Sequence, residues 1–299
     1  MSLTALLLPL LLVQSAADGP VQGVAAMREG STPRRTGTPS PQTFEEPSRL
    51  QSCLSTAAQD PDAAEDTANA WLREVKGSQQ AEPRMCLGWA YSTQQRWDDA
   101  TRTFLAGRDI AAASDHVLRA RLGAMAGNSA LAAQAEGADG AAARALPLLD
   151  VAHGDARAAG DAHLAGDIAI DRARALVALE RDGDAAIALA EARSASPDNA
   201  YGWLLSATLS RRLKQLAQAQ SQIETAAQLA PLDPEIGLEA GVIAVLSGRN
   251  AAAAKSWQSV IAAAPTSPSA DKARGYLAQI GSAPTDSALA APAHASTGR

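Results

Sequence analysis

The sequence is poor in aromatic residues and in cysteine. Aromatic side chains make up 3% of its 299 residues, so smaller side chains must fill most of the interior. Two cysteines are present, too few for the dense disulfide framework of small secreted domains. The four histidines do not stand at ligand spacing with these cysteines, which argues against a Cys/His zinc site.

The chain also lacks an excess of positive charge. It carries 26 Lys and Arg against 32 Asp and Glu, for a formal net charge of -6. Proteins that bind nucleic acid phosphates usually present a broad basic face. Nucleic acid is therefore not an expected partner.

Motifs that specify a reaction are missing as well. The sequence contains no Gly-rich phosphate loop, no HExxH and no GxSxG. Close acid and imidazole pairs fall at predicted helix borders, where solvated capping explains them. They are Asp115-His116, His153 with Asp155, and Asp161 with His163. We expect no catalytic residue, no metal site and no cofactor, and thus no enzyme.

An apolar run near the start, LTALLLPLLLV at residues 3–13, is too short to cross a bilayer as a helix. Small residues at positions 15–17 follow it, which is typical of a secretory signal cut after Ala17. No Lys or Arg precedes the run, so a buried amphipathic helix and a wrong start codon stay open as alternatives. The signal interpretation predicts an exported, periplasmic protein without a membrane span.

The chain divides by composition into four segments. About a quarter of all residues are alanine, the strongest helix former, and we expect helices with little or no sheet. Residues 1–17 form the predicted signal peptide and residues 48–281 the predicted helical repeat domain. Residues 18–47 and 282–299 are rich in Gly, Pro, Ser, Thr or Ala, without apolar periodicity, and are predicted to be a disordered leader and tail.

Residue types recur at an interval of 34, which indicates a repeated structural unit. The recurring sets are Pro197, Pro231 and Pro265, the small residues Ala207, Gly241 and Gly275, and the bulky pair Ile223 and Trp257. Apolar stripes on both sides of a polar bend near Lys214 predict two facing helices with alanine at their crossings. Asp233-Pro234 and Ser267-Pro268 predict helix starts, each with a capping residue followed by proline at the first helical position.

This helix-turn-helix unit resembles the tetratricopeptide repeat over residues 48–281. The matching residues in window 81–114 are Leu87, Gly88, Tyr91, Trp97, Ala100 and Phe104. Those in window 234–265 are Gly241, Gly248, Ala253, Trp257 and Pro265. The resemblance implies an all-α, right-handed α-solenoid of about five to six antiparallel helix pairs, closed by a lone last helix. The repeat around 116–160 is expected to be longer and irregular, with its second helix delayed to about Ala141 and kinked at Pro147.

Cys53 and Cys86 fall in the first helices of consecutive units. Such helices lie side by side in a stacked array, so a disulfide between them is geometrically reasonable. Two independently buried thiols are the alternative.

The resemblance also implies that a concave groove lined by first helices binds extended peptides or partner helices. Trp89 and Tyr201 lie beside the stripes that meet the second helices and are expected to face this groove. The expected groove residues are Glu82, Met85, Trp89, Ser92, Tyr201, Leu204, Thr208, Arg211, Glu235, Leu238 and Val242. Some relatives grip a terminal carboxylate with Lys and Asn, but the matching positions here hold Met85, Trp89, Leu205 and Glu239, so we do not expect that mode.

The sequence therefore predicts a non-catalytic interaction scaffold of the cell envelope that binds a protein or peptide in its groove. The alternative is a structural module that associates through its end helices or convex face, including as a homo-oligomer. An enzyme or a carrier of a small ligand is a third possibility, because the irregular middle repeat can open a pocket.

Overall fold

The computed structural model describes residues 47–135, 137 and 139–281. The predicted signal peptide, the leader up to residue 46 and the tail lie outside the described residues. The described part contains thirteen α-helices, one short 3-10 helix and no strand. This confirms the all-α prediction.

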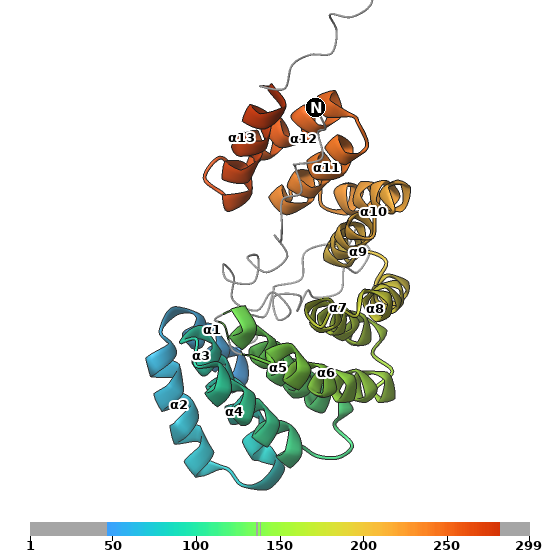
Figure 1. The fold of residues 1–299 in the computed structure, drawn as a ribbon. Coiled ribbons are helices and arrows are strands. Elements are labelled where there is room, and N and C mark those ends of the chain that lie inside the picture. The colour runs from blue at the N-terminus through green and yellow to red at the C-terminus, as the bar shows by residue number, and fades with distance from the viewer. Residues whose placement is uncertain (1–46, 136, 138, 282–299) are drawn as a thin grey trace, which may run out of the picture. The chain divides into compact units, whose positions relative to one another are not determined.

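The chain divides into two compact units, Met1–Pro197 and Asp198–Arg299. The first unit contains α1 (Arg49–Gln59), α2 (Pro61–Glu74), the 3-10 helix η3 (Gly77–Gln80), α3 (Ala81–Thr93), α4 (Trp97–Ile110), α5 (His116–Ala135), α6 (Ala141–Ala158), α7 (Ala162–Ala178) and α8 (Asp182–Ala195). The second contains α9 (Ala200–Arg212), α10 (Leu216–Leu229), α11 (Pro234–Leu246), α12 (Asn250–Ala263) and α13 (Pro268–Gly281). Figure 1 shows these helices coloured along the chain.

The helices stack as consecutive pairs. Each odd-numbered helix from α1 to α11 packs against the next helix in the chain. First helices of successive pairs also contact each other: α1 contacts α3, α5 contacts α7, and α11 contacts both α9 and α13. Short connections make the two helices of a pair antiparallel. The six pairs and the lone α13 confirm the predicted solenoid of helix pairs.

Local sequence explains where the helices begin. Asp60 and Asp233 cap α2 and α11 by accepting hydrogen bonds from backbone N–H groups, and a proline follows each of them. Ser267 Oγ accepts from the backbone N–H of Ala270 at the start of α13. Proline costs no hydrogen bond at the first helical position, because that N–H has no partner within the helix. The predicted starts at Pro234 and Pro268 are thus confirmed.

The interval of 34 is also present in the turns. Glu180, Lys214 and Gly248 are 34 residues apart and have φ angles of 59°, 60° and 74°. A left-handed residue at this point ends the first helix and lets the second begin two residues later. The bend predicted near Lys214 is this turn.

The irregular repeat is α5 and α6. They contain 20 and 18 residues, compared with 13 and 14 in α9 and α10. The second helix begins at Ala141, as predicted, and Pro147 lies inside it. Gly127 allows α5 and α6 to approach closely, since a Cβ atom there would lie 2.5 Å from Leu149 Cδ2.

Small residues set how closely the paired helices pack. In the second unit Ala207, Ala219 and Ala226 are fully buried around Ile223. Gly241 plays the same role against Trp257, because a Cβ atom on Gly241 would overlap the indole ring. A Cβ atom on Gly275, one interval later, would meet no other atom within 4 Å, since no second helix follows α13 in the described residues.

We predict opposite effects for alanine at these two equivalent positions. Gly241→Ala should lower the free energy of unfolding by about 1–3 kcal/mol, because Trp257 must shift within a filled core. Gly275→Ala should raise it by up to about 1 kcal/mol, because alanine favours helix over glycine at an exposed site. Urea denaturation followed by circular dichroism measures both, and equal effects would contradict this packing.

A disulfide joins the first two pairs. The structure links Cys53 of α1 to Cys86 of α3, with their Cα atoms 6.0 Å apart and a sequence separation of 33. Both cysteines are buried, beside Ala57, Ala64 and Ala90. The link lies between neighbouring first helices, the arrangement expected from the sequence.

We predict that this disulfide stabilises the array. In the loop-closure model a crosslink over a loop of this length contributes about 3–4 kcal/mol. Guanidinium denaturation of the native and the reduced chain should differ by that amount, while the reduced chain should match the Cys53→Ala, Cys86→Ala variant apart from the loss of buried sulfur. Two titratable thiols in denatured, non-reduced native protein would contradict the crosslink.

Candidate functional site

The surface formed by α3, α5 and α7 in the first unit, and by α9, α11 and α13 in the second, is here called the first-helix face of each unit. On the first of these faces Glu82 is exposed and Trp89 is half-buried. Met85 and Ser92 are buried, at 1% and 6% exposure. Met85 packs with Ala100 and Phe104, and the Ser92 hydroxyl lies 3.2 Å from the Ser129 hydroxyl of α5. These two predicted groove residues are interior residues, which corrects the prediction.

The second unit presents most of its predicted groove residues. Glu235 is exposed, and five others are half-buried: Tyr201, Thr208, Arg211, Leu238 and Val242. Leu204, at 6% exposure, belongs instead to the core around Ile223. The prediction was wrong for Leu204 because a first helix packs against both its own partner and the neighbouring pair, which leaves a narrower exposed strip.

Arg211 carries a charge that the protein itself compensates. Its Nε donates to Glu239 Oε1 across α9 and α11 at 2.5 Å, and the two side chains are 23% and 13% exposed. The structure pairs it with a carboxylate 28 residues away.

Other polar groups on this face come from α13. Burial raises the pKa of Tyr276. The positive charge of Arg211 lowers this pKa, and the negative charge of Glu239 raises it. Tyr276 therefore remains a neutral hydroxyl close to both charges, and its ring lies 5.1 Å from that of Trp257. Although Glu235 as a whole residue is exposed, nearby atoms partly desolvate its carboxyl group, and this effect, followed by the charge of Asp233, raises its pKa. Lys272 of α13 acts in the opposite direction.

A buried polar cluster links α5 to α7 in the first unit. Asn128 Nδ2 donates to Asp171 Oδ2 at 2.6 Å, and Arg174 lies 3.3 Å from the other carboxylate oxygen. Burial raises the pKa of Asp171, against the lowering effect of Arg174 and of the hydrogen bond from Asn128. This cluster was not predicted from the sequence, although Asn and Asp within alanine-rich helices are a signal for buried polar contacts.

The acid and imidazole residues that are close in the sequence make their contacts with other residues. His153 is buried with its Nε2 3.1 Å from Glu191 Oε1, whereas Asp155 binds Arg108 at 2.7 Å. The expectation that His153 is a solvated cap is therefore wrong. Asp115 and Asp161 do cap α5 and α7, through the N–H groups of Leu118 and Leu164.

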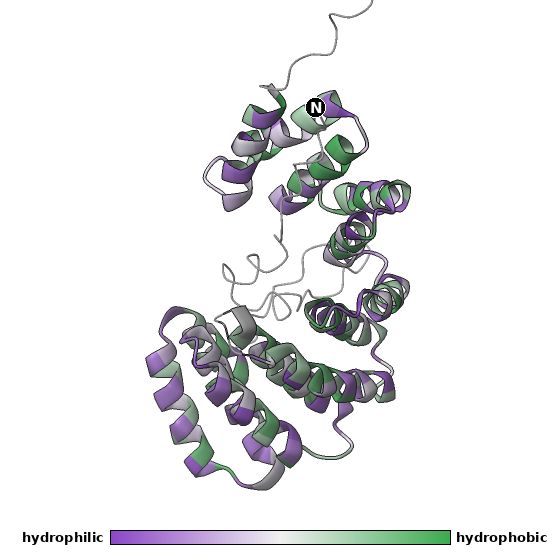
Figure 2. Ribbon diagram, viewed as in Figure 1, coloured by the Kyte–Doolittle hydropathy of each residue, from purple (hydrophilic) through white to green (hydrophobic). Residues whose placement is uncertain are grey.

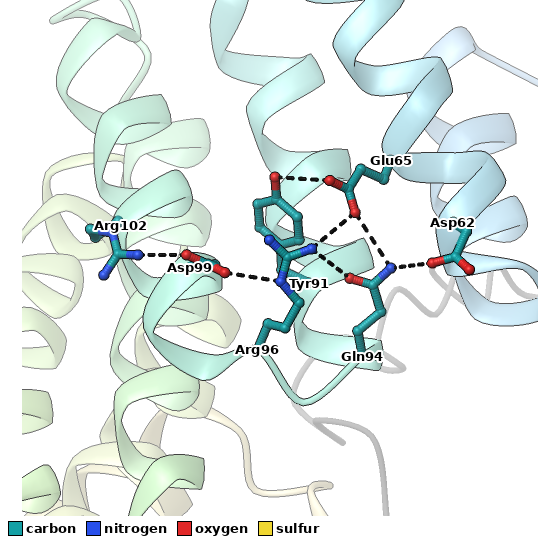
Figure 3. A network of polar contacts seen from close by, with 7 residues as sticks. All are labelled: Asp62, Glu65, Tyr91, Gln94, Arg96, Asp99 and Arg102. Atoms are coloured by element: carbon teal, nitrogen blue, oxygen red, sulfur yellow. Dashed lines mark hydrogen bonds and ion pairs between the residues drawn. The ribbon is translucent and has the colours of Figure 1, made fainter.

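A polar network ties α2 to the turn between α3 and α4 (Figure 3). Glu65 accepts hydrogen bonds from the Tyr91 hydroxyl at 3.2 Å and from Arg96 Nη1 at 3.1 Å. The Arg96 guanidinium also lies 4.0 Å from the centre of the Tyr91 ring and donates from Nε to Asp99 at 2.9 Å. Burial, and then the charge of Glu65, raise the pKa of Tyr91, so its hydroxyl stays a donor. The network thus joins α2 to the turn between α3 and α4.

A shallow cleft of about 420 Å³ lies beside this network. It is lined by Gln95, Arg96, Trp97, Asp98, Asp99, Ala133 and Gly137.

Among the residues that the structure describes, no three His, Cys, Asp or Glu side chains are placed to share a metal ion. Hydrophobic and hydrophilic residues are interspersed along the helices (Figure 2), and none of the described helices is long and apolar enough to span a membrane.

We predict that burial of the Asp171 carboxylate makes stability depend on pH. The pKa of Asp171 is raised in the folded state. The protonated carboxyl group therefore contributes to the free energy of unfolding fully below the pKa of the unfolded chain, about 4, and this contribution is lost as pH rises. Asp171→Asn keeps an acceptor for Asn128 without a buried charge, so its stability relative to the parent chain should increase between about pH 4 and about pH 7.5. Urea denaturation at both pH values measures this.

Asp150→Asn provides the control for that measurement. Asp150 forms a surface ion pair with Arg172, and its loss should cost less than about 1 kcal/mol. If the difference in free energy of unfolding between Asp171→Asn and the parent chain stays constant with pH, Asp171 does not have a raised pKa in the folded state.

Sequence comparison finds no matching family model and no match among curated proteins. Solved structures do resemble the chain. PilW, described as a widely conserved type IV pilus biogenesis factor, is 16% identical with a TM-score of 0.59, and the match covers 75% of this chain and 95% of PilW. PilF of Pseudomonas aeruginosa is 13% identical with a TM-score of 0.59, covering 76% and 95%. BtubC from P. vanneervenii is 12% identical with a TM-score of 0.53, covering 84% and 100%.

At these identities the similarity concerns the fold. PilW and PilF are tetratricopeptide-repeat proteins, and the matches span nearly their whole length. The helix pairs, the 34-residue interval and these structural neighbours agree. The chain has the tetratricopeptide-repeat fold, a solenoid of stacked helix pairs.

Proposed function

We propose that the protein is a non-catalytic scaffold of the cell envelope that binds a protein or peptide on its first-helix faces. Proteins of this fold are in general interaction modules. The observation that carries the proposal is the composition of the second unit's face. Tyr201, Leu238 and Val242 remain partly exposed there, and aromatic and apolar side chains of this kind supply most of the binding energy at protein interfaces.

Two features support a location outside the cytoplasm. The apolar run at residues 3–13 followed by small residues is typical of a signal peptide. A buried disulfide such as Cys53–Cys86 persists in oxidising compartments. PilW, a structural neighbour, is described as a pilus biogenesis factor, which fits an envelope role for this architecture.

A second candidate function is assembly through the opposite side of the helix pairs. Ile187 of α8 is 70% exposed and Val151 of α6 is 49% exposed. Both lie on second helices, away from the first-helix face. Apolar side chains this exposed favour a contact with another copy or another envelope protein.

Site-specific photocrosslinking in the protein's own cells separates the two functions. We predict that a photoreactive phenylalanine derivative at position 208 forms adducts with another polypeptide. Tyr201→Ala in the same chain should lower the adduct yield at least about five-fold, because residues 201 and 208 share one side of α9. The helical circular dichroism should be unchanged.

The same derivative at position 187 is the matched control. Adducts from position 187 alone, with twice the mass of the chain, would favour assembly through the second helices. Adducts from position 208 that do not respond to Tyr201→Ala would contradict binding on the first-helix face.

A further inference from the structure

The Arg211–Glu239 ion pair places hydrogen-bond donors with little net charge on the second unit's first-helix face. Arg211 Nε donates to Glu239 Oε1, and both side chains are mostly withdrawn from water. A guanidinium has five N–H donors in a fixed plane, so this bond uses one edge. The paired arginine keeps its remaining donors but has little net charge to offer.

Neutral groups surround this pair. Thr208 lies one turn before Arg211 on α9, and its hydroxyl is already bound to the Leu204 carbonyl. On α11, Val242 lies one helical turn after Glu239, and Leu238 lies one turn before Val242; both are half-buried. The phenol of Tyr276 on α13 interacts electrostatically with Arg211 and Glu239, and its raised pKa keeps it protonated. Arg211 of α9 and Tyr276 of α13 thus place hydrogen-bond donors beside the apolar side chains of α11.

This arrangement discriminates between kinds of ligand. An acidic side chain or a terminal carboxylate would have to share Arg211 with Glu239 and would be repelled by that carboxylate. A main-chain carbonyl oxygen carries no net charge and can accept from the guanidinium without displacing Glu239. In an extended peptide, alternate side chains point the same way, so apolar residues of the ligand can pack on Leu238 and Val242.

We propose that Arg211, held by Glu239, binds main-chain carbonyl groups of an internal, apolar stretch of extended peptide. This inference rests on the proposed function and names the class of ligand for the same face. Recognition is by hydrogen bonds to the backbone and by apolar contacts. Attraction between net charges has no part in it.

The test uses two libraries of random linear peptides, one displayed within a loop of the carrier protein and one ending in a free carboxylate. The full chain should enrich peptides from the internal library that contain leucine or aromatic residues and few acidic ones. Their affinity should change less than about three-fold between about 0.05 and about 0.5 M sodium chloride, because screening weakens attraction between net charges and leaves apolar contacts intact.

Two variants examine the charge pair. Glu239→Gln leaves Arg211 with an unpaired charge, so it should enrich acidic or carboxylate-terminated peptides whose affinity falls at least about ten-fold over the same salt range. Arg211→Gln should weaken the peptides selected by the parent chain about ten-fold, the effect of losing one or two hydrogen bonds. Lys255→Gln, which removes an exposed cation from α12, should change neither result. Thermal denaturation confirms that each variant is folded.

The outcomes separate the inference from the function on which it rests. If the parent chain enriches acidic or carboxylate-terminated peptides and loses them in Tyr201→Ala, the inference is wrong and the first-helix face still binds peptides. If neither library is enriched, the inference is wrong, and the crosslinks from position 208 still decide the proposed function, which includes binding of a folded protein. If Tyr201→Ala and Arg211→Gln both leave peptide binding unchanged, the inference and binding on the first-helix face are both wrong.

Discussion

The structure depends on close approach between helices whose facing side chains are very small. Alanine and glycine at the crossings, such as Ala207 and Gly241, let backbones come near enough for Ile223 and Trp257 to fill the space between them. A pair built this way buries little apolar area and cannot be stable alone. Each pair therefore needs a neighbour, and the chain repeats one unit until α13 covers the last apolar side.

Much of this architecture could be predicted from the sequence because its signals are local. Prolines 34 residues apart and the Asp-Pro start of α11 fixed the length and phase of the unit. The surface was harder to predict. A helical stripe identifies one buried side, but a first helix in a stack packs against its own partner and also against the neighbouring pair. Met85, Ser92 and Leu204 are buried by these combined contacts. The division of the chain after Pro197 had no counterpart in the repeat pattern.

The polar contacts of the first-helix faces could not be derived from spacing. Asn128 meets Asp171 from 43 residues away, and Arg211 meets Glu239 from 28. Neither separation equals the interval of 34. The pair α5 and α6 is longer than the other repeats, and Arg211 lies in the last turn of α9 whereas Glu239 lies well before the end of α11. Both pairs cross between successive first helices. They therefore add polar contacts between repeats to a stack whose buried apolar residues are mostly alanine.

The disulfide between α1 and α3 gives the array unequal ends. At one end a covalent bond reinforces the contacts of the first pair. At the other end α13 is held by packing against α11 and α12. In a linear stack, local opening begins where a terminal element has the fewest neighbours. Fraying, hydrogen exchange and attack by proteases should consequently progress from the carboxyl-terminal helix inward, which gives the solenoid a direction of unravelling as well as a direction of synthesis.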